Sequence, residues 1–410
     1  MKHRKHIKPD FSRIPIRPRD RAIYRDNVPA HAMNNPLYRA LPGPRAFADV
    51  EKIVEEGNPL FDPSINALSA MDRRERIDEV LGVFVAVRNH QNLEDLVMTT
   101  IRQAALAFPL TERFLEETVK PGQLAAAARQ KSSRRSVGAG AVYGTVGSGK
   151  TESLIQILMS CPQTIEHGEF NGRRLGFVQI SWIYVSMPPK ASAFGFLLWI
   201  AGVLDLLLES TYWSDVLHAR NHTEATGIVA SALALNAVGA VFCDELQNIE
   251  VGSKAERALL ENTIQELVNA THTRFVFVGT NEARDAVNSE ALHRRMTGER
   301  GQLTWTPLKF GEDWDKFINA IWAWQVTSVP TPLTPELSAL LHRLTGGVPD
   351  YAKKLFTAMQ AAVIGNEKQF PKEQMPKEGF VKMMRIRFPK IHKQLERRFA
   401  IANPRAAALP

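Results

Sequence analysis

The sequence predicts an α/β fold of three layers, in which a parallel sheet is covered by helices on both faces. Between residues 138 and 310, short and nearly continuous apolar stretches alternate with helix-patterned stretches, which is typical of parallel strands buried on both faces. A glycine-rich turn follows the first apolar stretch, and acidic or amide side chains follow two later ones. With 410 residues, 44% of them hydrophobic and 23% charged, the chain is long enough to bury a large core.

The predicted elements alternate along the chain. The strands are expected at residues 140–144, 175–187, 237–245 and 273–282. The helices between and after them are expected at residues 149–160, 193–210, 223–237 and 253–270. After residue 310 the pattern becomes helical again, which indicates a smaller lid behind the sheet.

Five segments are expected. They are an extended basic arm (1–45), a helical N-terminal region (46–137), an α/β core (138–310), a helical lid (311–365) and a basic tail (366–410). The arm is rich in proline and has little apolar periodicity, so we expect an extended segment that can order on a partner.

The net charge of +8 lies at the two ends of the chain. Residues 1–45 carry 11 Lys/Arg against 3 Asp/Glu, residues 366–410 carry 11 against 4, and the middle is acidic. Such ends either reach an anionic partner or are simply solvated. Cys161 and Cys243 show no metal or disulfide spacing, which favours the cytoplasm. The most apolar stretch is interrupted by Asp205, and no signal peptide is recognisable, so no membrane association is expected.

A phosphate-binding loop is predicted at G-T-V-G-S-G-K-T, which matches G-x-x-x-x-G-K-[ST] between a strand and a helix. Its residues are Gly144, Thr145, Val146, Gly147, Ser148, Gly149, Lys150 and Thr151. Glycines let backbone N–H groups and the helix N-terminus face phosphate oxygens. We expect Lys150 to reach the β- and γ-phosphates of ATP and the Thr151 hydroxyl to bind Mg²⁺. The alternative is a chance glycine-rich turn.

An acidic pair ends the predicted strand at 237–245. Asp244 and Glu245 end this strand, where ligands of open α/β sheets collect. We expect Asp244 to hold the Mg²⁺ of the nucleotide through water and Glu245 to polarise the attacking water. An acidic pair in a surface turn is the alternative.

A polar amide and a pair of arginines follow the next strand. Asn281 is expected to hydrogen-bond the attacking water and the γ-phosphate, or else to cap the following helix. Arg294 or Arg295 would stabilise charge on the γ-phosphate of a neighbouring subunit, with Arg284 as a less favoured candidate. A solvated basic face is the alternative for the arginine pair.

In this order, the phosphate loop, CDE, GTNEA, the paired arginines and the helical lid resemble the AAA+ ATPases over residues 140–360. Within that superfamily the chain resembles the TniB/TnsC group of transposition regulators, which are related to MuB. The stretches NNPLYRALP, VFCDELQNI and LTGGVPDYAKKLF carry this narrower likeness. It implies ATP-dependent oligomerisation into rings or filaments on double-stranded DNA, which then recruit or activate a transposase.

The resemblance also implies partners and further residues. The N-terminal arm would meet a target-selector protein (TniQ/TnsD-like), and the C-terminal tail would meet transposase subunits (TnsA/TnsB-like) or DNA. Lys190 follows the second strand and would contact DNA phosphates, unless it is an ordinary loop lysine. Asp350 stands where many relatives carry a lid arginine, so Lys353 or Lys354 would have to replace that arginine and hydrolysis would be slow.

Two other functions stay open on these residues. One is a nucleotide-dependent signalling or scaffold switch without a DNA role, which the acidic middle favours. The other is a replication initiator or helicase loader, which the lack of a recognisable nucleic-acid module after the lid disfavours.

Overall fold

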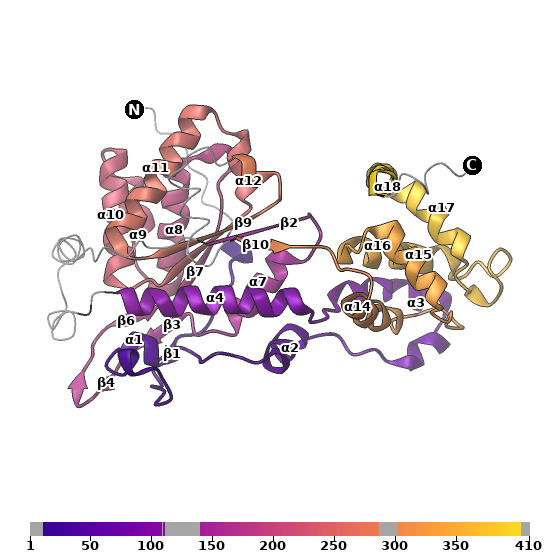
Figure 1. The fold of residues 1–410 in the computed structure, drawn as a ribbon, viewed down its shortest axis with the longest axis horizontal. Helices are drawn as coiled ribbons and strands as arrows, with labels where there is room; N and C mark the ends of the chain where they lie inside the picture. Colours follow the sequence, from indigo (N-terminus) through magenta and orange to yellow (C-terminus); the bar gives the residue numbers. More distant parts are fainter. Residues whose placement is uncertain (1–10, 109, 111–139, 287–301, 403–410) are drawn as a thin grey trace. The chain divides into compact units, whose positions relative to one another are not determined.

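The computed structural model describes residues 11–108, 110, 140–286 and 302–402 (Figure 1). The chain divides into two compact units. Unit 1 comprises Met1–Ala46, Gln91–Gly144 and Lys150–Thr304, and unit 2 comprises Phe47–His90, Thr145–Gly149 and Trp305–Pro410. These units cut across the five expected segments, because the helical N-terminal region is shared between them.

The main sheet has five strands in the order β10–β2–β9–β8–β7. The strands are β2 (Gly140–Gly144), β7 (Trp182–Ser186), β8 (Ala240–Asp244), β9 (Arg274–Gly279) and β10 (Gln302–Trp305). β2 pairs with β9, β9 with β8, and β8 with β7, each in parallel. All five residues of β8 are buried, as expected of a strand covered on both faces.

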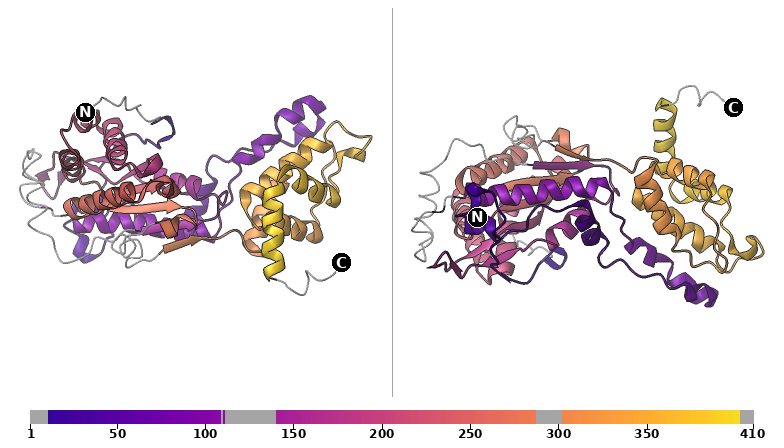
Figure 2. Two further views of the ribbon diagram at one scale, coloured as in Figure 1. Left: turned by 90° about the horizontal axis from the view of Figure 1, so that it is seen from above. Right: turned by 60° about the horizontal axis from the view of Figure 1, so that its bottom comes forward.

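Helices cover both faces of this sheet (Figures 1 and 2). α8, α10 and α11 lie on one face, and α4 and α7 lie on the other. The helices of this part are α4 (Arg88–Ala107), α7 (Lys150–Met159), α8 (Ala193–Leu208), α9 (Tyr212–Leu217), α10 (His222–Leu235), α11 (Lys254–Thr271) and α12 (Ala283–Ala286). α11 begins with a capping box in which Ser253 and Glu256 satisfy each other's backbone N–H groups. The predicted three-layer α/β fold is confirmed.

The stretch at 175–187, predicted as one strand, forms two. β6 (Val178–Ile180) belongs to a small sheet of order β1–β3–β6, whereas β7 belongs to the main sheet. Between them the Ser181 N–H donates to the Gln163 carbonyl over 2.8 Å, and the Ser181 hydroxyl donates to the Pro162 carbonyl. The backbone thus changes partners at Ser181, which a continuous apolar run does not reveal. A short hairpin of β4 (Glu169–Phe170) and β5 (Arg173–Arg174) precedes these strands.

The N-terminal segment from Phe11 onward packs within unit 1, whereas we expected an extended arm that could order on a partner. β1 (Asp20–Arg21) pairs in parallel with β3 (Thr164–Glu166), and α1 (Pro36–Arg39) follows. The Phe11 ring lies edge-on to the rings of Trp199 and Trp213, with centroid distances of 5.2 and 6.1 Å. Widely spaced apolar anchors hold this proline-rich segment, and such anchors leave no periodic signal.

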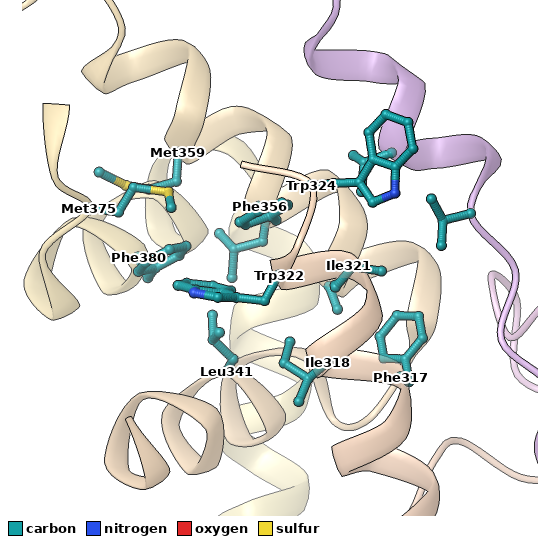
Figure 3. Close-up of a cluster of buried hydrophobic side chains, with 14 of the residues drawn as sticks. Phe317, Ile318, Ile321, Trp322, Trp324, Leu341, Phe356, Met359, Met375 and Phe380 are labelled. Carbon is teal, nitrogen blue, oxygen red and sulfur yellow. The ribbon is translucent and has the colours of Figure 1, made fainter. Parts of the chain in front are cut away.

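Unit 2 is helical and includes the segment Phe47–His90. Its helices are α2 (Phe47–Glu55), α3 (Ala70–Glu75), α14 (Glu312–Trp322), α15 (Pro335–Thr345), α16 (Pro349–Val363), α17 (Lys377–Arg387) and α18 (Pro389–Ala402). Figure 3 shows its core, where Trp322 lies among Phe356, Leu341 and Phe380. α17 ends at Arg387 and α18 begins at Pro389.

The segment Phe47–His90 is tied to the C-terminal helices by apolar and ionic contacts. The Phe61 ring packs on the Trp324 ring at a centroid distance of 5.2 Å. Arg73 of α3 forms a buried ion pair with Glu373. Among the described residues, no helix combines the length and the apolar character that a bilayer span requires.

Candidate nucleotide site

The predicted phosphate loop has the conformation that its glycines allow. β2 ends at Gly144, the turn Thr145–Gly149 follows, and α7 begins at Lys150. Gly147 and Gly149 have φ angles of 76° and 92°, a region that residues with a Cβ rarely adopt. The Ser148 hydroxyl donates to the Thr145 carbonyl over 2.7 Å and tightens the turn. Strand, glycine turn and helix therefore follow one another as a phosphate loop requires.

Lys150 is buried at the start of α7 and interacts electrostatically with acidic residues of the core. Its ammonium donates to the Gly144 carbonyl over 2.9 Å, and its residue is 9% exposed. Burial lowers the pKa of Lys150, while the negative charges of Asp244, Glu245 and Glu282 oppose this shift. The structure thus brings Lys150 into the electrostatic reach of both predicted acidic residues. Glu282, just after Asn281, is an acidic neighbour that the sequence reading missed.

Asp244 is held by two hydrogen bonds at the end of β8. The Tyr184 hydroxyl donates to Asp244 Oδ2 over 2.8 Å, and the Glu245 N–H donates to Asp244 Oδ1 over 2.7 Å. Asp244 is 3% exposed. Burial, followed by the charge of Asp244, raises the pKa of Tyr184, so this hydroxyl stays protonated and acts as a donor. The carboxylate orientation is therefore fixed by the chain itself.

Tyr184 was not predicted from the sequence, although strand periodicity offers a signal. Ser186 pairs with Asp244 and Tyr184 pairs with Phe242 across β7 and β8. Because side chains alternate along a strand, Tyr184 and Asp244 point to the same face of the sheet. The pairing of these two strands had to be known before this contact could be inferred.

Glu245 adopts a backbone conformation that is unusual for a residue with a side chain. Its φ and ψ are 59° and 40°, in the left-handed region. Desolvation raises the pKa of Glu245, the Asp244 charge adds to this, and a hydrogen bond from the Gln247 amide opposes it. Strain of this kind in non-glycine residues is concentrated at functional sites. The Asn248 amide donates to the Met187 carbonyl over 2.8 Å and fixes the turn after Glu245.

The segment after β9 is described only in part. The Thr280 hydroxyl, rather than Asn281, accepts the N–H of Ala283 at the start of α12. Thr280 therefore makes the side-chain bond to the start of α12 that was the alternative role for Asn281. Asn281 is exposed. Arg284 is also exposed. Arg294 and Arg295 lie outside the described residues, and their role stays a prediction.

The turn Thr145–Gly149 belongs to unit 2 and accepts hydrogen bonds from other residues of the same unit. The Trp305 indole N–H donates to the Ser148 carbonyl over 2.9 Å, and the Asp350 N–H donates to the Gly147 carbonyl over 3.2 Å. Trp305 is 3% exposed, and its ring lies edge-on to that of His90. Two backbone carbonyls of the phosphate loop thus have fixed donors.

The two lid lysines have different surroundings. Lys353 is buried, donates to the Leu81 carbonyl over 3.0 Å and lies 4.6 Å from the centre of the Phe84 ring. Lys354 donates to Asp350 Oδ2 over 2.8 Å. A nucleotide contact by either lysine stays a prediction, and Lys354 is the one paired with a residue that touches the phosphate loop.

Lys190 is exposed on the turn that follows β7. Lys190 and Ala191 have positive φ angles of 60° and 52°, so the chain makes a tight turn before α8. The exposure agrees with a solvent-facing lysine, and its contact with DNA stays a prediction.

The comparisons with known proteins concern this same core. Residues 133–287 match the family described as an AAA domain. No curated relative matches the sequence.

Three solved structures resemble the chain at low identity. The Walker-type ATPase PABY2304 of Pyrococcus abyssi is 11% identical, with a TM-score of 0.39, and the match covers 73% of this chain and 81% of that one. A mutant RuvB of Thermotoga maritima is 13% identical, with a TM-score of 0.31, and the match covers 65% of this chain and 66% of that one. The ADP form of the Aeropyrum pernix ORC2 protein is 13% identical, with a TM-score of 0.35, and the match covers 67% of this chain and 71% of that one.

Proposed function

We propose that this protein is an ATPase of transposition that assembles on duplex DNA while ATP is bound and disassembles after hydrolysis. The observation that carries the ATPase part is the electrostatic interaction of buried Lys150, the first residue of α7, with the acidic residues Asp244 and Glu245. The link to transposition rests on the TniB/TnsC-like stretches of the sequence.

The residues present suit a magnesium nucleotide. The loop offers backbone N–H groups and an ammonium, while Thr151 and Asp244 offer the hydroxyl and carboxylate oxygens that Mg²⁺ prefers. Bound Mg²⁺ would neutralise negative charge on the β- and γ-phosphates. Lys150 would orient these phosphates, and Asp244, held by Tyr184, would keep its carboxylate in one orientation.

Glu245 would act on water in this scheme. Glu245 directly follows Asp244 at the end of β8, and its carboxylate would accept a proton from the attacking water. Asn281 would position the same water, and Arg294 or Arg295 of a neighbouring subunit would meet charge developing on the γ-phosphate. Hydrolysis would then depend on assembly.

The DNA part of the proposal is supported by the placement of charge. Lys190 stands exposed on a turn, and repetition along a filament would multiply its single phosphate contact. Such contacts carry no base specificity, so the target would be chosen by a TniQ/TnsD-like partner. TnsA/TnsB-like transposase subunits would meet the basic C-terminal tail.

Phosphate release tests the ATPase assignment. Lys150→Ala should abolish binding of Mg²⁺–ATP, whereas Glu245→Gln should retain binding but lower turnover by at least about a hundredfold. The matched control is Glu250→Gln, an exposed glutamate of the same turn, which should leave both unchanged. Full turnover by Glu245→Gln would remove Glu245 from its assigned role.

Electron microscopy with duplex DNA tests the assembly. Rings or filaments should form with a slowly hydrolysed ATP analogue, fail to form with ADP, and weaken in Lys190→Gln. Assembly that requires the analogue but not DNA would instead support the signalling or scaffold switch. Loading of a helicase by the assembled protein would support the initiator alternative.

A further inference from the structure

The carboxylate of Asp350 lies close to Gly147 of the phosphate loop, and both residues belong to unit 2. Asp350 Cβ and Oδ2 each lie 3.1 Å from the position that a Cβ on Gly147 would take, and the Asp350 N–H donates to the Gly147 carbonyl over 3.2 Å. No side chain larger than that of glycine would fit at Gly147 without moving Asp350. The contact therefore joins the middle of the phosphate loop to the start of α16.

The position of Asp350 is fixed by the turn before α16. The Leu308 N–H donates to the Gly347 carbonyl over 2.8 Å, and a Cβ on Gly347 would stand only 2.0 Å from the Leu308 carbonyl oxygen. The His342 ring contacts the same Leu308 oxygen at 2.9 Å. Pro349 then starts the helix and limits the backbone further. Asp350 is thus delivered to the loop by a turn with little freedom.

The charge of Asp350 is opposite to what a phosphate loop recruits. Backbone N–H groups and Lys150 attract phosphate oxygens, whereas a carboxylate beside Gly147 repels them. The cation paired with Asp350 is Lys354, at 2.8 Å, and these side chains are 35% and 51% exposed. A half-exposed ion pair of this kind neutralises a charge only in part.

We infer that Asp350 is an affinity-determining residue which weakens nucleotide binding at the phosphate loop, and that Lys354 relieves part of this effect. The inference rests on the proposed nucleotide site and goes beyond it, because it assigns an opposing role to a residue where the resemblance implies a nucleotide-binding arginine. Release of nucleotide would then be built into the lid.

Titration calorimetry with Mg²⁺–ATPγS tests this on the full chain. Asp350→Asn keeps the side-chain shape and the backbone bond to Gly147, so it should tighten binding about tenfold. Lys354→Gln should weaken binding about threefold, but should have no effect in the Asp350→Asn background. The gain from Asp350→Asn should shrink as the salt concentration rises, which a purely structural role would not produce.

The matched control is Glu336→Gln, which removes an exposed acid from the first turn of α15 in the same unit. It should leave the affinity unchanged. Unchanged or weaker binding by Asp350→Asn would overturn the inference while leaving the nucleotide site intact. If Lys150→Ala binds as well as the unaltered protein, the proposed site itself fails, and the inference fails with it.

Discussion

The buried ion pair between Arg73 and Glu373 should hold unit 2 together across a separation of 300 residues in sequence. The Arg73 and Glu373 side chains are 6% and 1% exposed. Glu373 also accepts the N–H groups of Gly365 and Ser328, each over 2.8 Å. Burial alone would raise the pKa of Glu373, but the hydrogen bonds from Arg73, Gly365 and Ser328 lower it to about 2.

The size of the effect follows from this pKa. The ordinary value for glutamate here is 4.5, so folding lowers the pKa from 4.5 to about 2. At about 1.4 kcal/mol per pKa unit, this corresponds to about 3 kcal/mol of folding free energy. Because the folded pKa is the lower one, this contribution is complete above pH 4.5 and is lost as the pH falls towards 2.

Glu373→Gln removes the charge but keeps the shape. We expect it to lower the free energy of opening of unit 2 by about 3 kcal/mol at pH 7 and by little near pH 2, where Glu373 has lost about half of its charge. Native-state hydrogen exchange of the α16 amides at pH 7 measures this opening, and acid unfolding followed by tryptophan fluorescence gives the pH dependence. The control is Glu378→Gln, at an exposed glutamate of α17.

An equal loss of stability in the two variants, or a loss from Glu373→Gln that does not diminish towards pH 2, would refute the reasoning. The first result would mean that any charge near α17 matters. The second would mean that shape rather than charge holds the pair together.

Three further substitutions test other contacts. Tyr184→Phe should raise the Mg²⁺ concentration needed for half-maximal ATP turnover about tenfold, because Asp244 loses its hydrogen-bond donor. An unchanged Mg²⁺ titration would exclude this role for Tyr184. Trp305→Phe should speed hydrogen exchange in the turn Thr145–Gly149, since the Ser148 carbonyl loses its donor, and unchanged exchange would count against it. Gly202→Ala places a Cβ 2.3 Å from the Phe11 ring and should destabilise unit 1 by about 1 to 3 kcal/mol in chemical unfolding, but much less if Phe11 is also alanine.

The parts of the site that could be predicted are those whose geometry is local. A strand, a glycine turn and a helix in sequence are enough to place Lys150, and a buried strand that ends in an acid is enough to place Asp244. Both expectations needed only the period of a strand and the conformational freedom of glycine.

The contacts that escaped prediction join residues far apart in sequence. Tyr184 reaches Asp244 only because β7 and β8 are neighbours in a particular register. Arg73 reaches Glu373 only because Phe47–His90 folds with the C-terminal helices. The packing of the N-terminal segment was not predicted for a related reason. Proline content describes how a chain behaves alone, and it does not show that Phe11 packs on Trp199 or that Leu37 is buried in the fold.

Asp350 marks the point where sequence and structure complement each other. The resemblance stated in the sequence analysis implied a lid arginine at this position, and it left open which lysine would replace it. The structure places Lys353 against Leu81 and Phe84, and it places Asp350 against Gly147 with Lys354 as its ion-pair partner. A lid that carries a negative charge to the phosphate loop favours loss of nucleotide over its retention. If the protein assembles as we propose, with a lifetime set by bound ATP, such a charge would shorten that lifetime without altering the residues that act in hydrolysis.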